Sequence, residues 1–110
     1  MKQEDKELLL KDLCTRLPYG VNIKDDYGDI IHVNIYNAHI EHLIDRISLG
    51  IDKMVLRSLS SMTEEERETY LLFSYARCND KAFDWLNAHH FDYRGLIGKG
   101  LALEAPKRMY

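Results

Sequence analysis

The sequence predicts an α+β fold: an N-terminal helix, a small antiparallel sheet of two or three strands, and two C-terminal helices packed on one face of that sheet. Three observations predict it. Leucines recur at helical spacing near the start, apolar and polar residues alternate over residues 29–36, and a helix-start motif occupies residues 63–66. The 110 residues are expected to form a single globular domain, 1–110.

The first helix is expected from Gln3 to Arg16. One apolar stripe runs along it at helical spacing, formed by Leu9, Leu10, Leu13 and Leu17. Glu4 and Asp5 lie near its start, where the helix dipole favours negative charge. Pro18 ends the helix, because the residue before a proline is disfavoured in the helical conformation.

Two strands are expected next, at Tyr19–Lys24 and Asp29–Tyr36. In the second, Ile31, Val33 and Ile35 alternate with polar or aromatic residues, which is the period of a half-buried strand. The turn formers of residues 25–29 predict a hairpin loop with Gly28 in a left-handed conformation. Local antiparallel pairing follows.

Residues 40–49 admit two interpretations. The i, i+3, i+4, i+7 spacing of Ile40, Leu43, Ile44 and Ile47 favours a helix, capped by Asn37 and ended by Gly50. A strand around Arg46–Leu49 is the competing interpretation. Residues 53–57 alternate again and are expected to return to the sheet as a third strand.

Thr63 and Glu66 form the capping-box pattern, with acids filling the first turn. A helix is therefore expected from Thr63 to about Arg77, burying some of Tyr70, Leu71, Leu72 and Phe73. Asn79 or Asp80 is expected to cap another helix, through about His89, with Phe83, Leu86 and Trp85 facing inward. Residues 91–97 then predict a tight turn or a single helical turn.

Charge is balanced along the chain, which gives little reason to expect nucleic acid as a partner. There are 15 Lys plus Arg and 18 Asp plus Glu, a net charge of −3, and neither half is basic.

No apolar run approaches the ~20 residues of a membrane span, and the N-terminus lacks the pattern of a signal peptide. The cysteines, Cys14 and Cys78, are isolated, so a reducing cytoplasm is expected and Cys14 is expected to be a small buried residue.

Catalytic and metal-binding patterns are incomplete. No nucleophile elbow, P-loop or dinucleotide-binding glycine pattern is present, and no cofactor is expected. His39 and His42 would share a helix face, and His89, His90 and Asp92 form a second set, but neither set has a third ligand at a fixed spacing. A metal site is therefore not predicted.

The segment Trp85–Ile97 concentrates the residue types that dominate protein interfaces. The interaction candidates are Trp85, His89, His90, Phe91, Tyr93 and Arg94. The competing interpretation is that these side chains close one end of the core of a small domain.

Four stretches, in order, carry a resemblance to a known group of proteins. They are residues 17–21, 56–66, 84–97 and 99–106, and the Trp-Leu-Asn…Asp-Tyr-Arg-Gly-Leu-Ile block within them is the most specific. Together they resemble a group of small uncharacterised proteins of gut anaerobic bacteria, often in phage-like or other mobile-element contexts. The resemblance implies a bacterial cytoplasmic protein with a phage-linked role, but no activity. It leaves residues 22–50 as the variable part.

The leading hypothesis is a small non-catalytic protein-interaction module that binds a protein partner, with homo-oligomerisation left open. The alternative is a small metal-dependent or acid–base enzyme that uses His32, His39, His42 or the set His89–Asp92. The alternative requires at least three of these side chains to converge in a concave pocket.

Overall fold

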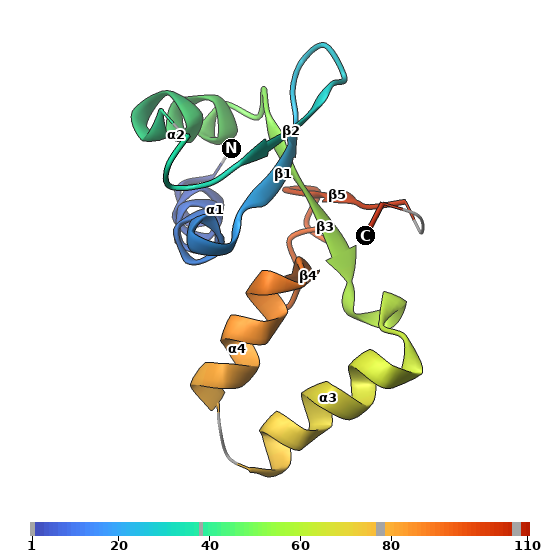
Figure 1. The fold of residues 1–110 in the computed structure, drawn as a ribbon. Coiled ribbons are helices and arrows are strands. Elements are labelled where there is room, and N and C mark those ends of the chain that lie inside the picture. The colour runs from blue at the N-terminus through green and yellow to red at the C-terminus, as the bar shows by residue number, and fades with distance from the viewer. Residues whose placement is uncertain (1, 38, 77–78, 107–108) are drawn as a thin grey trace.

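A computed structural model describes residues 2–37, 39–76, 79–106 and 109–110. Over these residues the fold is α+β, with four helices and a mixed five-stranded sheet (Figure 1). In chain order the helices and strands are α1 (Gln3–Arg16), β1 (Val21–Lys24), β2 (Ile30–Val33), α2 (Ile40–Ser48), β3 (Lys53–Ser58), α3 (Glu64–Tyr75), α4 (Asn79–Ala88), β4 (Phe91–Asp92) and β5 (Leu103–Glu104). Short 3₁₀ turns, η1 (Leu17–Tyr19) and η2 (Leu59–Ser61), follow α1 and β3.

The sheet is mixed, which corrects the antiparallel expectation. β1 pairs antiparallel with both β2 and β3, as a hairpin and its return strand should. β4 and β5 instead run parallel to β3. A parallel pair needs a long crossover connection, and here α3 and α4 provide it between β3 and β4.

The core lies between the sheet, α1 and α2. Its buried side chains are Leu9, Leu13, Leu17, Val21, Ile23, Leu43, Ile47, Met54, Leu56, Leu96, Leu101 and Ala102. The predicted apolar stripe of α1 is therefore confirmed for three of its four leucines; Leu10 is only half-buried. Residues 40–48 form a helix, and Gly50 follows it with a positive φ of 75°.

The C-terminal helices do not cover the sheet, which is a second correction. Figure 1 shows α3 and α4 extending away from the sheet, while α1 and α2 lie beside β1. Of the four apolar residues expected to be buried in α3, Tyr70 and Phe73 are half-buried and Leu71 and Leu72 are exposed. The packing partner of α3 is α4, and α4 in turn contacts α1 and β4.

Several local expectations also change. The second strand is shorter than expected, ending at Val33, because Asn34 and Asn37 form a turn: the Asn34 amide donates to Asn37 Oδ1 at 2.8 Å. Asn37 thus serves this turn, and α2 begins after His39 without a side-chain cap. Phe91 and Asp92 form a strand rather than a turn. The predicted helix end at Arg77, and Cys78, lie outside the described residues.

β2 is the edge of the sheet, which changes the burial of the second strand. Ile31 and Ile35 were expected to face the core, but they are 47% and 45% exposed. Val33 is half-buried against the core. No helix among the described residues combines the length and apolar character that a membrane crossing requires.

Candidate functional site

A groove of about 780 Å³ runs between α1 and α4. The residues that line it are Lys11, Cys14, Thr15, Pro18, Tyr19, Asp80, Phe83, Asp84, Asn87, Tyr93 and Arg94. Two of the six interaction candidates, Tyr93 and Arg94, are in this lining. Cys14 is also there and is exposed, contrary to the buried position expected for it.

Tyr93 forms an aromatic platform in the groove. Its ring lies 5.2 Å from the ring of Phe83, which was expected to face inward but lines the groove and is 49% exposed. The guanidinium carbons of Arg16 and Arg94 lie 5.3 and 5.1 Å from the Tyr93 ring centroid, within cation–π range. The Tyr93 hydroxyl donates to Asn87 Oδ1 at 2.9 Å, so the ring is fixed at its polar end as well.

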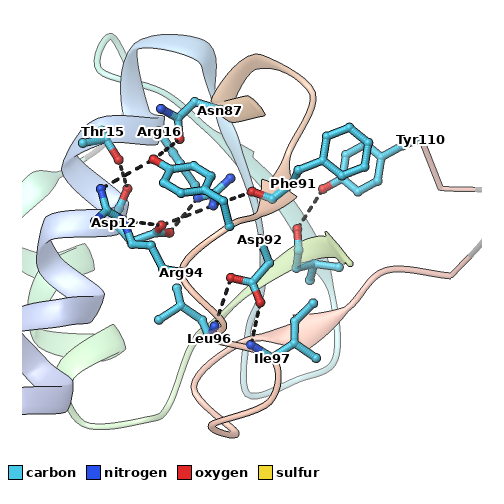
Figure 2. Close-up of polar contacts among 12 residues, drawn as sticks. Asp12, Thr15, Arg16, Asn87, Phe91, Asp92, Arg94, Leu96, Ile97 and Tyr110 are labelled. Atoms are coloured by element: carbon cyan, nitrogen blue, oxygen red, sulfur yellow. Dashed lines mark hydrogen bonds and ion pairs between the residues drawn. The ribbon is translucent and has the colours of Figure 1, made fainter. Parts of the chain in front are cut away.

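A buried ion-pair network lies beneath this platform (Figure 2). Arg16 Nε donates to Asp12 Oδ2 at 2.6 Å, and Arg16 Nη2 donates to Asp12 Oδ1 at 3.2 Å. Arg94 Nε donates to the same Asp12 oxygen at 3.1 Å. The Asp12 and Arg16 side chains are fully buried, whereas Arg94 remains 19% exposed. One carboxylate thus faces two guanidinium groups and holds Arg94 at the groove.

Arg16 also ties α1 to the strand that follows α4. Its Nη2 donates to the carbonyl oxygen of Phe91 at 2.7 Å. Its Nη1 is buried and has no hydrogen-bond partner among the described residues. Because a buried guanidinium is costly without compensation, the two contacts to Asp12 and the one to Phe91 are what allow Arg16 to lie inside the fold.

Asp92 has a structural role that accounts for both of its carboxylate oxygens. Its two carboxylate oxygens accept hydrogen bonds from the backbone amides of Leu96 and Ile97, both at 2.9 Å (Figure 2). The side chain is buried with the residue 7% exposed. Asp92 therefore fixes the turn after β4, which in turn places Tyr93 and Arg94.

Of three other interaction candidates, Trp85 and Phe91 belong to the packing between α4, α3 and β3, whereas His89 is exposed beside Trp85. The Trp85 ring lies 4.4 Å from His89, 5.6 Å from Phe91 and 6.4 Å from Tyr70 of α3. Phe91 is fully buried, and the Arg57 guanidinium lies 4.1 Å above its ring. The structure therefore does not bring the six candidates together on one surface.

His90, the remaining candidate, is not part of the groove lining and instead lines a separate hollow with His89 and Tyr110. It adopts a positive φ of 66°, and its ring stacks on Tyr110 at 4.5 Å. Burial, with a smaller contribution from the positive charge of Arg16, lowers the pKa of His90 to about 4. The Tyr110 hydroxyl donates to the Val55 carbonyl at 2.8 Å, and burial raises the pKa of this phenol.

The histidine sets do not form a metal centre in the part of the chain that the structure describes. No group of three or more His, Cys, Asp or Glu side chains there could hold a metal ion. His32 Nδ1 is 2.9 Å from Asn22 Oδ1, while His39 and His42 are exposed near the start of α2. The convergence that the enzyme alternative requires is absent from these residues.

Four residues at this site were not predicted from the sequence as site residues: Asp12, Arg16, Phe83 and Asn87. One signal could have found the first two: an opposite-charge pair at i, i+4 spacing that lies on the same helix face as Leu9 and Leu13. No local signal indicates Arg94 as their partner, because it is 82 residues from Asp12. Comparison of the chain with family models, curated proteins and solved structures finds no match.

Proposed function

We propose that this chain is a small non-catalytic protein-interaction module that binds a segment of a partner protein in the groove between α1 and α4. The observation that carries the proposal is the Phe83–Tyr93 platform beside Arg94, held by a buried carboxylate. Aromatic and arginine side chains are the residues that contribute most to protein binding energy. Those that are already fixed lose little conformational freedom on binding.

The groove walls indicate the chemistry of the bound segment. Phe83 and Tyr93 offer an aromatic surface to an apolar side chain of the partner. Lys11 is exposed on the α1 side, and Arg94 is partly exposed beside it in the lining, so a carboxylate of the partner would find two cations. On the α4 side Asp80 and Asp84 provide negative charge, and Asp84 raises the pKa of Tyr19, chiefly by hydrogen bonding.

The same proposal places the module in the cytoplasm of a bacterium, in a phage-linked or other mobile-element context. Support comes from the isolated cysteines and from the resemblance of residues 84–97 to the proteins of gut anaerobes described above. The balanced charge favours a protein partner over nucleic acid. Tyr93 and Arg94 remain the binding candidates, and Phe83 and Lys11 join them.

Affinity capture from a bacterial host with groove variants tests the proposal. Phe83→Ser and Lys11→Glu change side chains at the surface of the groove. Loss of an aromatic anchor should lower the affinity for the partner about tenfold or more. The amount of partner captured should fall accordingly. Leu49→Ser is the matched control, because Leu49 is 71% exposed at the end of α2, away from the groove.

Melting curves by circular dichroism separate binding from folding in each variant. The proposal requires that both groove variants melt close to the parent chain and lose the partner, while Leu49→Ser retains it. If no partner is captured by the parent chain, or if the groove variants capture it as well as the control does, the groove is not the binding site.

A further inference from the structure

The helix α3 has a face with no partner in the described structure. None of its twelve residues, all of which are described, is buried. Leu71, Leu72 and Tyr75 are 40%, 69% and 81% exposed. An isolated helix of this length is marginal in water and normally gains its stability by burying an apolar face. Leu71, Leu72 and Tyr75 do not give α3 this stability, because they remain exposed to solvent.

These side chains lie on one face together with acids. At 100° per residue, six positions fall within an arc of about 120°. They are Glu64, Glu65, Glu68, Leu71, Leu72 and Tyr75, all exposed. We call this set the outward face of α3. The half-buried residues Glu66, Thr69, Tyr70 and Phe73 lie on the opposite side, which is where Tyr70 contacts Trp85 of α4.

The outward face is acidic, and one cation, Arg67, lies exposed at its margin beside Glu64, Glu68 and Leu71. Its first half carries three glutamates and its second half three apolar residues, with no lysine or arginine among the six. Glu66, which does form the capping box and the ion pair with Arg57, points to the other side. The outward glutamates form no ion pair among the described residues, so their charge is available to a partner.

We propose that the outward face of α3 binds a basic amphipathic helix of a partner protein. The apolar stripe of that helix would pack on Leu71, Leu72 and Tyr75, and its lysines or arginines would lie against the three glutamates. An amphipathic helix can pack along α3. Lysines or arginines in the last turn of the bound helix would also interact favourably with the dipole of that same helix. Its C-terminus would therefore lie near the start of α3, in an antiparallel arrangement.

A second copy of this chain is the less favoured occupant. Two outward faces packed in parallel about a two-fold axis would bring glutamates against glutamates, and like charges oppose association. Packed antiparallel, they would set the glutamates of each copy against the apolar half of the other, which supplies no opposite charge. This surface is separate from the groove between α1 and α4, since the groove lining contains no residue of α3. The proposal therefore stands or fails independently of the proposed function.

The test uses the full chain and a designed peptide of Leu, Lys and Ala, about 18 residues long so that it can form a helix, with Leu at helical spacing. A scrambled peptide of the same composition is its control. Fluorescence anisotropy should show binding of the amphipathic peptide and at least about tenfold weaker binding of the scrambled one. Chemical-shift changes in ¹⁵N-labelled protein should be largest at residues 64–75.

Charge reversal on the protein supplies the matched variants. Glu65→Lys with Glu68→Lys should weaken binding about tenfold, and Leu72→Ser should do the same through lost apolar contact. Glu4→Lys is the control, because Glu4 is an exposed acid in the first turn of another helix, α1. It should leave binding unchanged.

Three results would overturn the proposal. One is equal binding of the amphipathic and scrambled peptides, or equal weakening by Glu4→Lys, which would show general attraction between opposite charges. Another is shift changes centred on the groove or on β2. The third is a dimer in light scattering whose dilution perturbs α3, which would assign the face to a second copy of the chain.

Discussion

The helices α1 and α3 differ in the contacts that hold them in place. α1 buries Leu9, Leu13 and even the charged side chains of Asp12 and Arg16. α3 is of similar length, and none of its described residues is buried. The difference follows from position: α1 lies against the sheet, whereas α3 is part of the crossover that carries the chain out from β3 and back to β4 (Figure 1).

The comparison teaches that a helix can be specified locally without belonging to the core. α3 has a complete capping box, an Arg57–Glu66 ion pair at 2.7 Å and one aromatic contact with Trp85. α1 has no side-chain cap and depends on tertiary contacts. Residues that stabilise α3 should therefore act locally, and those of α1 should act on the whole fold.

The largest effect is expected from Asp12→Ala. Removing this carboxylate leaves Arg16 buried without its charge partner and frees Arg94, and breaking a buried pair from one side costs about 3–5 kcal/mol. Urea unfolding followed by circular dichroism measures the loss. Glu7→Ala is the control, an exposed acid on the same helix, and should change stability by less than about 0.5 kcal/mol.

Leucine truncation tests the comparison directly. Leu13→Ala removes a fully buried side chain and should lower the free energy of unfolding by about 2–5 kcal/mol. Leu72→Ala, on α3, removes one that is 69% exposed and should change it by less than about 0.5 kcal/mol. Equal losses in the two variants, measured by the same urea titration, would contradict the contrast between the helices.

Thr63→Ala should destabilise α3 by about 1 kcal/mol, because it removes the side-chain oxygen that accepts from the Glu66 amide at 3.2 Å. Hydrogen exchange should speed up within residues 64–75 and much less in α1. Thr63→Ser keeps the acceptor and should restore protection. Uniform loss of protection in both helices would mean that α3 is as tightly coupled to the core as α1.

Acid should weaken the Arg57–Glu66 contact in a defined pH range. Hydrogen bonding from Arg57 lowers the pKa of Glu66 from 4.5 to about 2. Because the folded pKa lies below the unfolded one, this stabilisation is present above about pH 4.5 and is lost as the pH falls through about 2. Urea midpoints of the parent chain should fall more steeply over this range than those of Glu66→Gln. Parallel curves would contradict the assignment.

His90 should show its effect in a higher pH range than Glu66. Its pKa is lowered from 6.5 to about 4, so its neutral form stabilises the fold above about pH 6.5 and that contribution is lost as the pH falls through about 4. His90→Asn keeps a residue that tolerates the positive φ and removes the titration. The variant should lose less stability than the parent between pH 7 and pH 5, measured by urea unfolding.

Elements with strong local signals could be predicted from the sequence. The leucine spacing predicts α1, the capping box predicts α3, and Gly28 takes the left-handed conformation, with a φ of 85°. β5 and the short β4 were missed, because two-residue strands have no period to detect and form only where β3 offers a free edge. Burial in β2 was overestimated, since alternation does not reveal which strand lies at an edge.

The candidate site was predicted only in part, for the same reason. Tyr93 and Arg94 were found from their residue types, but the other four candidates of the Trp85–Arg94 segment pack elsewhere. Phe91 lies in the interior, Trp85 packs between α4 and its neighbours, and His89 is exposed beside Trp85. Residue type indicates how a side chain can interact, whereas the direction in which it points depends on the turn fixed by Asp92.

The sequence by itself determined the α+β class, the bounds of α1, the start of α3 at its capping box and the first hairpin, because each depends on residues close together in the chain. The tertiary structure decided the rest: the parallel pairing of β4 with β3, the burial of Asp12 with Arg16 and Arg94, and the outward face of α3. These depend on contacts between residues tens of positions apart. Such contacts form only when the core between α1, α2 and the sheet brings those segments together.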